Sequence, residues 1–366
     1  MKNLPKLNPK TKNIFVSLLI IIAIGLFLRA YRISYQCMWT DEQYTAAMVT
    51  QSFQQIWTQL MVSDYTPPLF YWIDHISVTL LGVSNFAFRL PSVICGILLI
   101  PTMYYVGKTY NNYQTGIYCA ALTTILFPFT YYSQFARAYS MSMLCFALLL
   151  VFGIRILKGD IHLQTFCIYG ILAGITVWVH LYAFIPVVLL TIIVIYENRF
   201  RLKHCAVLLT VYTLILLPLY QMPFTLFAQR VNSYGSVPYG LHVSQLIATI
   251  PVEFFNTAFP IIFLLLVFGI NCDRKNKRMW ELFAVGMLTV ISGCILCGFT
   301  IFYARYLLTV SIIFVLLASI ALPDIFNSDN TINIRNAGFI LLLFSIIFIF
   351  QYPEFIAQYT TQKYIC

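Results

Sequence analysis

The sequence predicts an all-α polytopic membrane protein: a bundle of about eleven transmembrane helices with a long first extracytoplasmic loop that carries interfacial helices. Two observations support this fold class. Of the 366 residues, 60% are hydrophobic and 9% are charged, with a mean hydropathy of +0.83. Apolar runs long enough to cross the ~30 Å hydrocarbon core of a bilayer also recur along the whole chain. This composition excludes a soluble fold, and cytoplasmic anchor residues account for the net charge of +10 without any nucleic acid.

The apolar runs define the order of the elements. We interpret the first run as a span and not as a cleaved signal peptide, because it is too long and no small-residue cleavage site follows it. The whole chain, 1–366, is predicted to be one transmembrane domain with a cytoplasmic tail, 1–12, a first outer loop, 32–87, and a late outer loop, 225–253. The predicted spans are 15–31, 88–107, 115–132, 139–157, 163–179, 182–196, 205–224, 254–271, 280–300, 306–322 and 337–351.

The segment 67–84 decides the topology. It is apolar, yet Asp74 and His75 lie at its centre, where a charged residue in a span costs roughly 2.5–3.5 kcal/mol. If this segment lies flat on the outer surface, most of the 22 Lys and Arg residues fall in inner loops; if it spans, most fall outside. The positive-inside rule favours the first arrangement. We therefore predict an interfacial helix here, a cytoplasmic N-terminus and an extracytoplasmic C-terminus.

An acidic pair, Asp41-Glu42, lies in the first outer loop before a helical pattern over 42–62. Carboxylates held at the membrane surface of such a protein usually bind a ligand or take part in chemistry. For Asp41 the alternative is a role as N-cap of the 42–62 helix. Thr40 is an equally good cap, and Glu42 adds a second charge, so we favour a functional role for the pair.

Three arginines, Arg89, Arg137 and Arg305, lie at the outer ends of helices, where cations should be scarce. Arg137 and Tyr139 flank a helix start, where exposed N–H groups favour an anion. Taken alone, Arg137 fits equally well an arginine that reaches toward lipid phosphates. Three arginines on the same side as the acidic pair indicate a site for an anionic ligand.

The cysteines do not form a metal-binding pattern. Cys294 and Cys297 share one face of an apolar helix and are interpreted as small core residues. Cys37 and Cys366 both fall in outer segments, and the sequence leaves open whether they pair. The sequence contains no metal-ligand cluster and no phosphate-binding glycine loop.

Several motifs together resemble the type C glycosyltransferases of the protein O-mannosyltransferase and aminoarabinose-transferase group. The first outer loop holds Asp41-Glu42 and then Asp-x-x-Pro-Pro-Leu-Phe-Tyr-Trp at 64–72, followed by Gly-x-x-x-x-x-x-Arg-Leu-Pro-Ser at 82–92. Further matches are Ser-Gln-Phe-Ala-Arg-Ala-Tyr-Ser at 133–140, His-Leu-Tyr at 180–182 and Ala-Arg-Tyr-Leu-Leu at 304–308. Each motif alone matches the family pattern only in part. The resemblance rests on the order of the motifs along residues 15–322 and on their predicted location on the same side of the membrane.

The resemblance implies a polyprenyl-phosphate-linked sugar donor and transfer on the extracytoplasmic face. It implies that Asp41 is the catalytic base, and Glu42 is predicted to orient the acceptor or a cation. Arg137 and Arg305 take the positions of the donor-phosphate contacts, assisted by Tyr139. The residues predicted to bind substrate are Tyr44, Asp64, Tyr65, His180 and Tyr303.

The sequence departs from the family pattern at two positions, and the missing acid at the second leaves metal dependence open. Thr66 stands where many relatives have His or Lys, and Phe135 stands where bacterial relatives often have Glu. No cofactor is predicted with certainty, and the sequence leaves a divalent cation open.

The predicted function is inverting transfer of a sugar to an acceptor hydroxyl of a protein, glycolipid or glycan. The alternatives are a transporter or flippase of a lipid-linked or anionic solute, and an outer-face polysaccharide polymerase. A transporter should place charges inside its spans, near the midplane. A polymerase should have its long arginine-bearing loop late in the chain. The predicted location is a bacterial inner membrane, with membrane lipids as the other partners and no nucleic acid.

Overall fold

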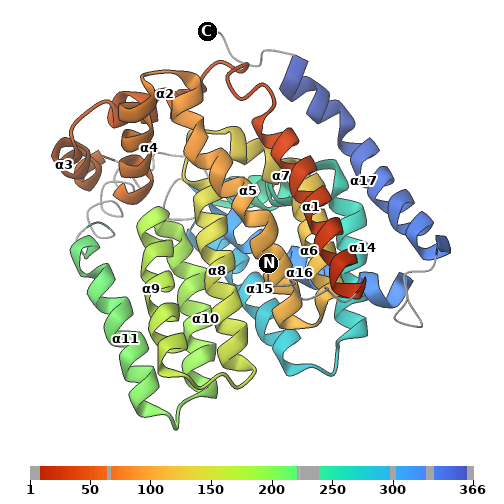
Figure 1. Cartoon of the computed structure of the whole chain (residues 1–366). Helices are drawn as coiled ribbons and strands as arrows, with labels where there is room; N and C mark the ends of the chain where they lie inside the picture. The colour runs from red at the N-terminus through yellow and green to blue at the C-terminus, as the bar shows by residue number, and fades with distance from the viewer. Residues whose placement is uncertain are drawn as a thin grey trace, which may run out of the picture.

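The computed structural model describes residues 9–63, 67–220, 222, 239–296, 302–326 and 334–360, and within these ranges the chain is helical without strands (Figure 1). The α-helices are α1 (Pro9–Ala30), α2 (Thr40–Val49), α3 (Phe53–Ser63), α4 (Pro68–Leu81), α5 (Asn85–Tyr110), α6 (Tyr113–Ile125), α7 (Phe127–Tyr131), α8 (Tyr139–Leu157), α9 (Leu163–Val179), α10 (Phe184–Glu197), α11 (Leu202–Leu216), α13 (Tyr239–Phe255), α14 (Phe259–Cys272), α15 (Lys277–Leu296), α16 (Leu308–Phe326) and α17 (Ile334–Thr360). Short 3₁₀ turns are η1 (Tyr132–Gln134), η2 (Leu181–Ala183), η3 (Leu217–Leu219), η4 (Asn256–Ala258) and η5 (Ala304–Leu307).

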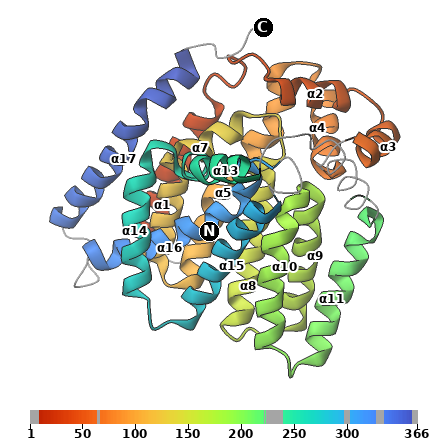
Figure 2. The same ribbon diagram turned by 180° about the vertical axis from the view of Figure 1, so that it is seen from behind.

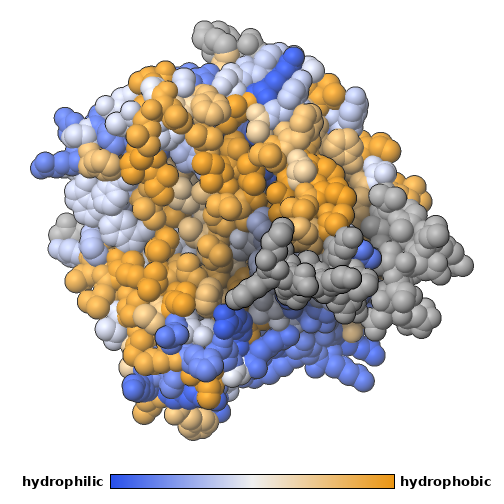
Figure 3. Space-filling model, in the orientation of Figure 1, coloured by the Kyte–Doolittle hydropathy of each residue, from blue (hydrophilic) through white to orange (hydrophobic). Residues whose placement is uncertain are grey.

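The predicted all-α membrane fold is confirmed. Each predicted span overlaps a helix, and in the described part of the chain eight helical stretches are long and apolar enough to cross a membrane. The helices α9 and α10 are apolar but shorter. A band of hydrophobic side chains covers the visible middle of the molecule, with hydrophilic side chains toward its two ends (Figure 3).

One predicted span is broken. The segment 115–132 was expected to be continuous, whereas α6 ends at Ile125 and α7 begins at Phe127. Pro128 is the cause, because proline has no N–H to donate and is tolerated only in a helix's first turn. The carbonyl of Thr123, near the end of α6, accepts a hydrogen bond of 2.8 Å from the buried Arg29 of α1. This cation therefore caps the negative end of the α6 dipole.

The centre of the bundle is α16. In the most apolar 18-residue window of Ala304–Ile325, 94% of the residues are buried, and α16 packs against α5, α6, α8, α14 and α15. Its contact with α14 is close at Gly269, where an added Cβ would lie 2.0 Å from the carbonyl oxygen of Leu317. Because η5 leads directly into α16, residues just before this helix are fixed to the most rigid part of the molecule.

The first outer loop forms three helices at one end of the bundle, α2, α3 and α4 (Figure 1). The predicted single helix over 42–62 is wrong in one respect, because the chain breaks at 50–52 between α2 and α3. With 14 residues, α4 is about 21 Å long, too short for the hydrocarbon core. It packs on α2, α3, α5 and α9, as expected for an interfacial helix. Pro68 occupies the first turn of α4, where proline is tolerated.

The same end of the molecule holds the C-terminal end of α17. Side chains of the segment after α1 donate hydrogen bonds to the last carbonyls of α17: Gln36 to Gln358 at 2.7 Å and Tyr35 to Thr360 at 2.6 Å. The neighbouring Cys37 is disulfide-bonded, and seven other described cysteines are free. Cys366 lies outside the described residues, so the question whether Cys37 pairs with Cys366 stays open.

Asp74 on α4 provides a pH test of this interfacial layer. It is fully buried, and no described residue forms a hydrogen bond with either of its carboxylate oxygens. Burial, together with the nearby charge of Glu42, raises the pKa of Asp74 from 3.8 to about 8. The folded state therefore holds a proton that the unfolded state has released, and stability falls as the pH rises from about 4 through 8.

We expect Asp74→Asn to unfold at a higher temperature than the wild type at pH 9, with the difference shrinking toward pH 5. Thermal unfolding in detergent, followed by tryptophan fluorescence, measures this. The exposed Asp324 supplies the control, and Asp324→Asn should show no such pH-dependent gain. An equal effect of Asp74→Asn at both pH values would contradict a protonated, buried Asp74.

Candidate active site

Asp41 faces an arginine that is remote in the sequence. The structure begins α2 at Thr40 with Trp39 as its N-cap, so Asp41 is the second helical residue and not the cap. Its Oδ2 lies 3.3 Å from Nη2 of Arg305, which is in η5, 264 residues later. The Asp41 side chain is 31% exposed, so the carboxylate stays open to a ligand.

Aromatic rings fix the guanidinium of Arg305. Its Cζ lies 4.2 Å from the ring centroid of Tyr303 and 4.8 Å from that of Trp39. Cation–π contacts of this kind stabilise an arginine side chain and restrict its position. Tyr303 itself is exposed. The predicted phosphate-binding residue is therefore held in place before any ligand binds.

Arg137 reaches the same place from the segment between η1 and α8. Its Nη1 donates hydrogen bonds to the hydroxyl of Tyr71 at 2.9 Å and to Oγ1 of Thr45 at 3.3 Å. Thr45 in turn donates to the backbone carbonyl of Asp41 at 3.1 Å. One turn of α2 thus connects Arg137 to the carboxylate, and the structure brings Asp41, Arg137 and Arg305 together.

Buried polar atoms without partners surround these arginines. The hydroxyl of Tyr139, Nδ1 of His180 and Nε of Arg305 are buried, and no described group bonds to them. The ring centroids of Tyr139 and His180 are 5.9 Å apart, and that of Tyr306 lies 5.6 Å from His180. Because buried polar groups in proteins are almost always hydrogen-bonded, this set indicates a place where an anionic ligand supplies the missing acceptors.

Burial lowers the pKa of His180 to about 3, with a smaller contribution from the charge of Arg137. The imidazole is therefore neutral at neutral pH. It is able to hydrogen-bond a ligand, but it does not contribute a positive charge.

Glu42 is placed differently from its neighbour. Its carboxylate is fully buried and forms two hydrogen bonds with Arg89, Nε to Oε1 at 2.8 Å and Nη2 to Oε2 at 2.9 Å. It also accepts the backbone N–H groups of Ala136 at 2.9 Å and Trp39 at 3.2 Å. We therefore assign Glu42 a positioning role in place of direct contact with the acceptor or a cation.

Arg89 belongs to the fold for the same reason. Its remaining donors bond to the carbonyls of Ile33 at 2.8 Å, Gln36 at 2.9 Å and Cys37 at 3.3 Å. With all its hydrogen-bonding capacity used and 2% of its side chain exposed, it is not an anion-binding residue. The pair joins the segment 33–42, α5 and the residues before Arg137 into one unit.

Three predicted site residues remain, Tyr44, Asp64 and Tyr65. Tyr44 is exposed on α2. Asp64, Tyr65 and Thr66 lie outside the described residues. Within the described ranges no group of three His, Cys, Asp or Glu side chains is arranged to hold a metal ion. Sequence reasoning assigned no role to three residues that contact the site's arginines, Trp39, Thr45 and Tyr71. Even for Tyr71, which lies in the motif at 64–72, only the folded chain shows the contact.

Comparison with known proteins supports the resemblance. Residues 65–222 match the family described as dolichyl-phosphate-mannose-protein mannosyltransferase. The structure is similar to that of ArnT from Cupriavidus metallidurans in the apo state, with a TM-score of 0.66 and 13% identity, over 93% of this chain and 64% of that one. The chain has the fold of the type C membrane glycosyltransferases.

Two further structures share the type C fold. ArnT from Cupriavidus metallidurans bound to undecaprenyl phosphate matches with a TM-score of 0.60 and 14% identity, over 92% of this chain and 63% of that one. The oligosaccharyltransferase AglB from Archaeoglobus fulgidus, in complex with an inhibitory peptide and a dolichol-phosphate, matches with a TM-score of 0.57 and 14% identity, over 96% and 56%. This chain thus spans less than two thirds of the length of these proteins. A search of curated proteins found no match.

Replacing Glu42 by Gln tests the positioning role. Removing one charge of a buried pair leaves the other uncompensated, which costs about 3–5 kcal/mol. We expect Glu42→Gln to lower the unfolding temperature markedly, measured in detergent. Glu281, paired with Arg278 at the other end of the bundle but partly exposed, offers the matched control. Glu281→Gln should have only a small effect, and equal effects of the two variants would show that the Glu42 pair is not essential to the fold.

Proposed function

We propose that this protein transfers a sugar from a polyprenyl-phosphate-linked donor to an acceptor hydroxyl at the extracytoplasmic surface of a membrane. One observation supports this above all: a partly exposed carboxylate, Asp41, lies 3.3 Å from Arg305, with Arg137 joined to the same helix turn. The donor class is supported by the complexes of ArnT with undecaprenyl phosphate and of AglB with dolichol-phosphate.

The reaction is a single inverting displacement. The acceptor oxygen attacks the anomeric carbon while Asp41 takes its proton. The bond between that carbon and the phosphate oxygen breaks, and the phosphate departs with the electron pair. Arg137 and Arg305 stabilise the charge on the leaving phosphate, and the unpartnered Tyr139 hydroxyl donates a hydrogen bond to it.

The contact between Asp41 and Arg305 has a role in the proposed reaction. Without a ligand the guanidinium of Arg305 pairs with the Asp41 carboxylate. A donor phosphate competes for the same guanidinium, because phosphate offers several charged acceptor oxygens. Binding of the donor therefore frees Asp41 to receive the proton of the acceptor at the moment when the leaving group is in place.

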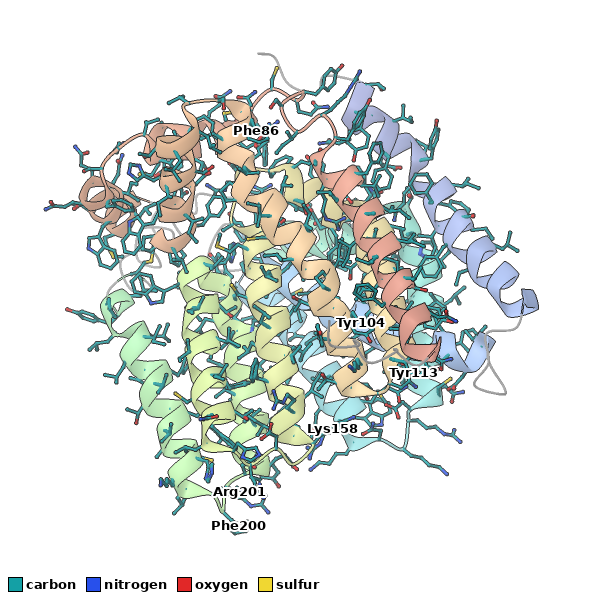
Figure 4. All side chains as sticks on the ribbon, in the orientation of Figure 1. Phe86, Tyr104, Tyr113, Lys158, Phe200 and Arg201 are labelled. Atoms are coloured by element: carbon teal, nitrogen blue, oxygen red, sulfur yellow. The ribbon has the colours of Figure 1, made fainter. Side chains whose placement is uncertain are left out.

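The orientation follows from the cations at the two ends. Lys158 and Arg201 lie at the end of the bundle opposite to Phe86, which marks the start of α5 beside the site helices (Figure 4). The segment 274–278 adds four more cations in the loop between α14 and α15. By the positive-inside rule, these cations support a cytoplasmic location for this end and an outer location for the site. We propose the cell membrane of a bacterium as its location, with a protein, glycolipid or glycan hydroxyl as acceptor.

Asp41→Asn removes the proposed base while preserving size and shape. We expect transfer to fall by roughly 10²–10⁴-fold, the usual contribution of a general base, with membrane insertion and stability unchanged. The assay incubates purified protein with a panel of radiolabelled polyprenyl-phosphate sugars and follows label leaving the lipid fraction.

Asp160 is the matched control for this variant, because it forms an ion pair of 2.7 Å with Arg155 in the loop between α8 and α9. Asp160→Asn should transfer sugar at the wild-type rate. Asp41→Asn retaining a tenth or more of wild-type activity would remove Asp41 from the base role. Movement of labelled lipid across vesicles without any transfer would favour the flippase alternative.

Arg305→Ala should chiefly raise the KM for the donor, with a smaller loss in kcat, because the arginine binds the phosphate in the ground state and in the transition state alike. Arg155→Ala, which breaks the Asp160 pair, is the control and should leave both constants unchanged. An unchanged donor KM in Arg305→Ala would make Arg305 a structural partner of Asp41 only.

A further inference from the structure

A cavity of about 320 Å³ is lined in part by Arg305, and the proposed mechanism has not used it. Its volume is at the lower end of the range for small-ligand pockets, roughly 300–1,000 Å³. It lies between the α7–η1 segment, α13, α17 and the residues before α2. The helix α13 crosses the bundle here instead of running along it (Figure 2). The lining residues are Trp39, Phe127, Pro128, Tyr131, Tyr132, Phe135, Val252, Glu253, Asn256, Arg305 and Glu354.

The lining combines aromatic faces with carboxylates. Tyr131 and Phe135 pack with ring centroids 4.6 Å apart, and Trp39 contacts Phe135 at 6.0 Å. Among these rings stand two acidic side chains, Glu253 and Glu354. A cavity for an isoprenoid tail would not contain two acidic groups, because an uncompensated charge beside hydrocarbon is costly.

Glu253 is held ready to accept hydrogen bonds. Its Oε2 accepts a short hydrogen bond from the hydroxyl of the buried Tyr132, which fixes the carboxylate at the cavity wall. A carboxylate has about four acceptor positions, and no other described group is bonded to this one. Oε2 of Glu354 is buried in the same wall without a described partner. The wall therefore presents acceptors that require donors from a ligand.

We infer that this cavity binds the sugar ring of the donor and that Glu253 is the residue that recognises it. A sugar offers hydroxyl donors to carboxylates and C–H faces to aromatic rings, the two kinds of group that the wall presents. Arg305 belongs both to the cavity wall and to the proposed phosphate site, so a phosphate at Arg305 places the attached sugar in the cavity. The volume fits one sugar ring better than a chain of them. This inference rests on the proposed function and names its donor subsite.

The test compares the binding of two lipids, undecaprenyl phosphate without a sugar and the sugar-linked form that the wild type transfers from a panel of hexoses and pentoses. We expect the wild type to bind the sugar-linked form more tightly. A hydrogen bond to a charged group contributes about 1.5–3 kcal/mol, so Glu253→Gln should weaken binding of that lipid roughly 10- to 100-fold. It should leave the affinity for undecaprenyl phosphate unchanged.

Two further variants make the result decisive. Tyr132→Phe keeps the ring but removes the hydroxyl that positions Glu253, and it should weaken sugar-linked donor binding in the same direction by a smaller factor. Asp273→Asn is the matched control, because Asp273 accepts a hydrogen bond of 2.5 Å from Tyr110 in an equivalent pair at the cytoplasmic end. It should change the affinity for neither lipid.

The outcomes separate the two proposals. Wild-type binding and transfer, with the preference for the sugar-linked lipid intact in both Glu253→Gln and Tyr132→Phe, would overturn the sugar subsite while the proposed function stands. A wild type that binds neither lipid and transfers no sugar would overturn the proposed function, and the subsite with it.

Discussion

The buried ion pair between Arg89 and Glu42 is the interaction on which the site depends. A charge pair removed from water is stable only when its geometry is good and its remaining donors and acceptors are used. Here five hydrogen bonds from Arg89 and two backbone N–H groups meet this condition. Few other arrangements of the segment 33–42, α5 and residues 135–137 would satisfy all the donors and acceptors of this buried pair. Asp41 is covalently next to Glu42, and Arg137 follows Ala136, so their positions are set by a pair that itself performs no chemistry.

Burial separates the arginines into two kinds. Only 2% of the Arg89 side chain is exposed, and all its donor groups are hydrogen-bonded, so its role is to stabilise the fold. Arg305 is 15% exposed, its Nε has no hydrogen-bond partner among the described residues, and it is held by ring faces that leave its edge available. An arginine that is fixed but not saturated is suited to a ligand that arrives and leaves, because little entropy is lost when it binds. The sequence shows the same residue type at the outer end of a helix in both cases.

Sequence reasoning located the spans because hydrophobic length is a one-dimensional property that a window can measure. Sequence reasoning failed where a single residue ends a helix or where a contact in space determines the role of a side chain. Pro128 breaks a predicted span, and the break at 50–52 divides a stretch with one continuous helical pattern. Sequence reasoning expected both Asp41 and Glu42 to contact the reactants, since only the path of the chain shows that one faces Arg305 and the other Arg89. Glu253 was missed altogether, because a lone carboxylate in an apolar helix acquires meaning only from Tyr132 and the cavity.

The disulfide at Cys37 bears on the orientation independently of the charge rule. Disulfides persist in oxidising compartments and are rare in the cytosol. Cys37 directly follows Gln36, whose side chain bonds to the end of α17, and its carbonyl accepts a hydrogen bond from Arg89. The disulfide therefore lies at the same end of the bundle as Asp41, while the cation-rich loops at 158 and 201 lie at the other. Two unrelated constraints, thiol oxidation at one end and cation retention at the other, support the same proposed orientation, in which a donor with its phosphate at Arg305 would meet its acceptor on the outer face.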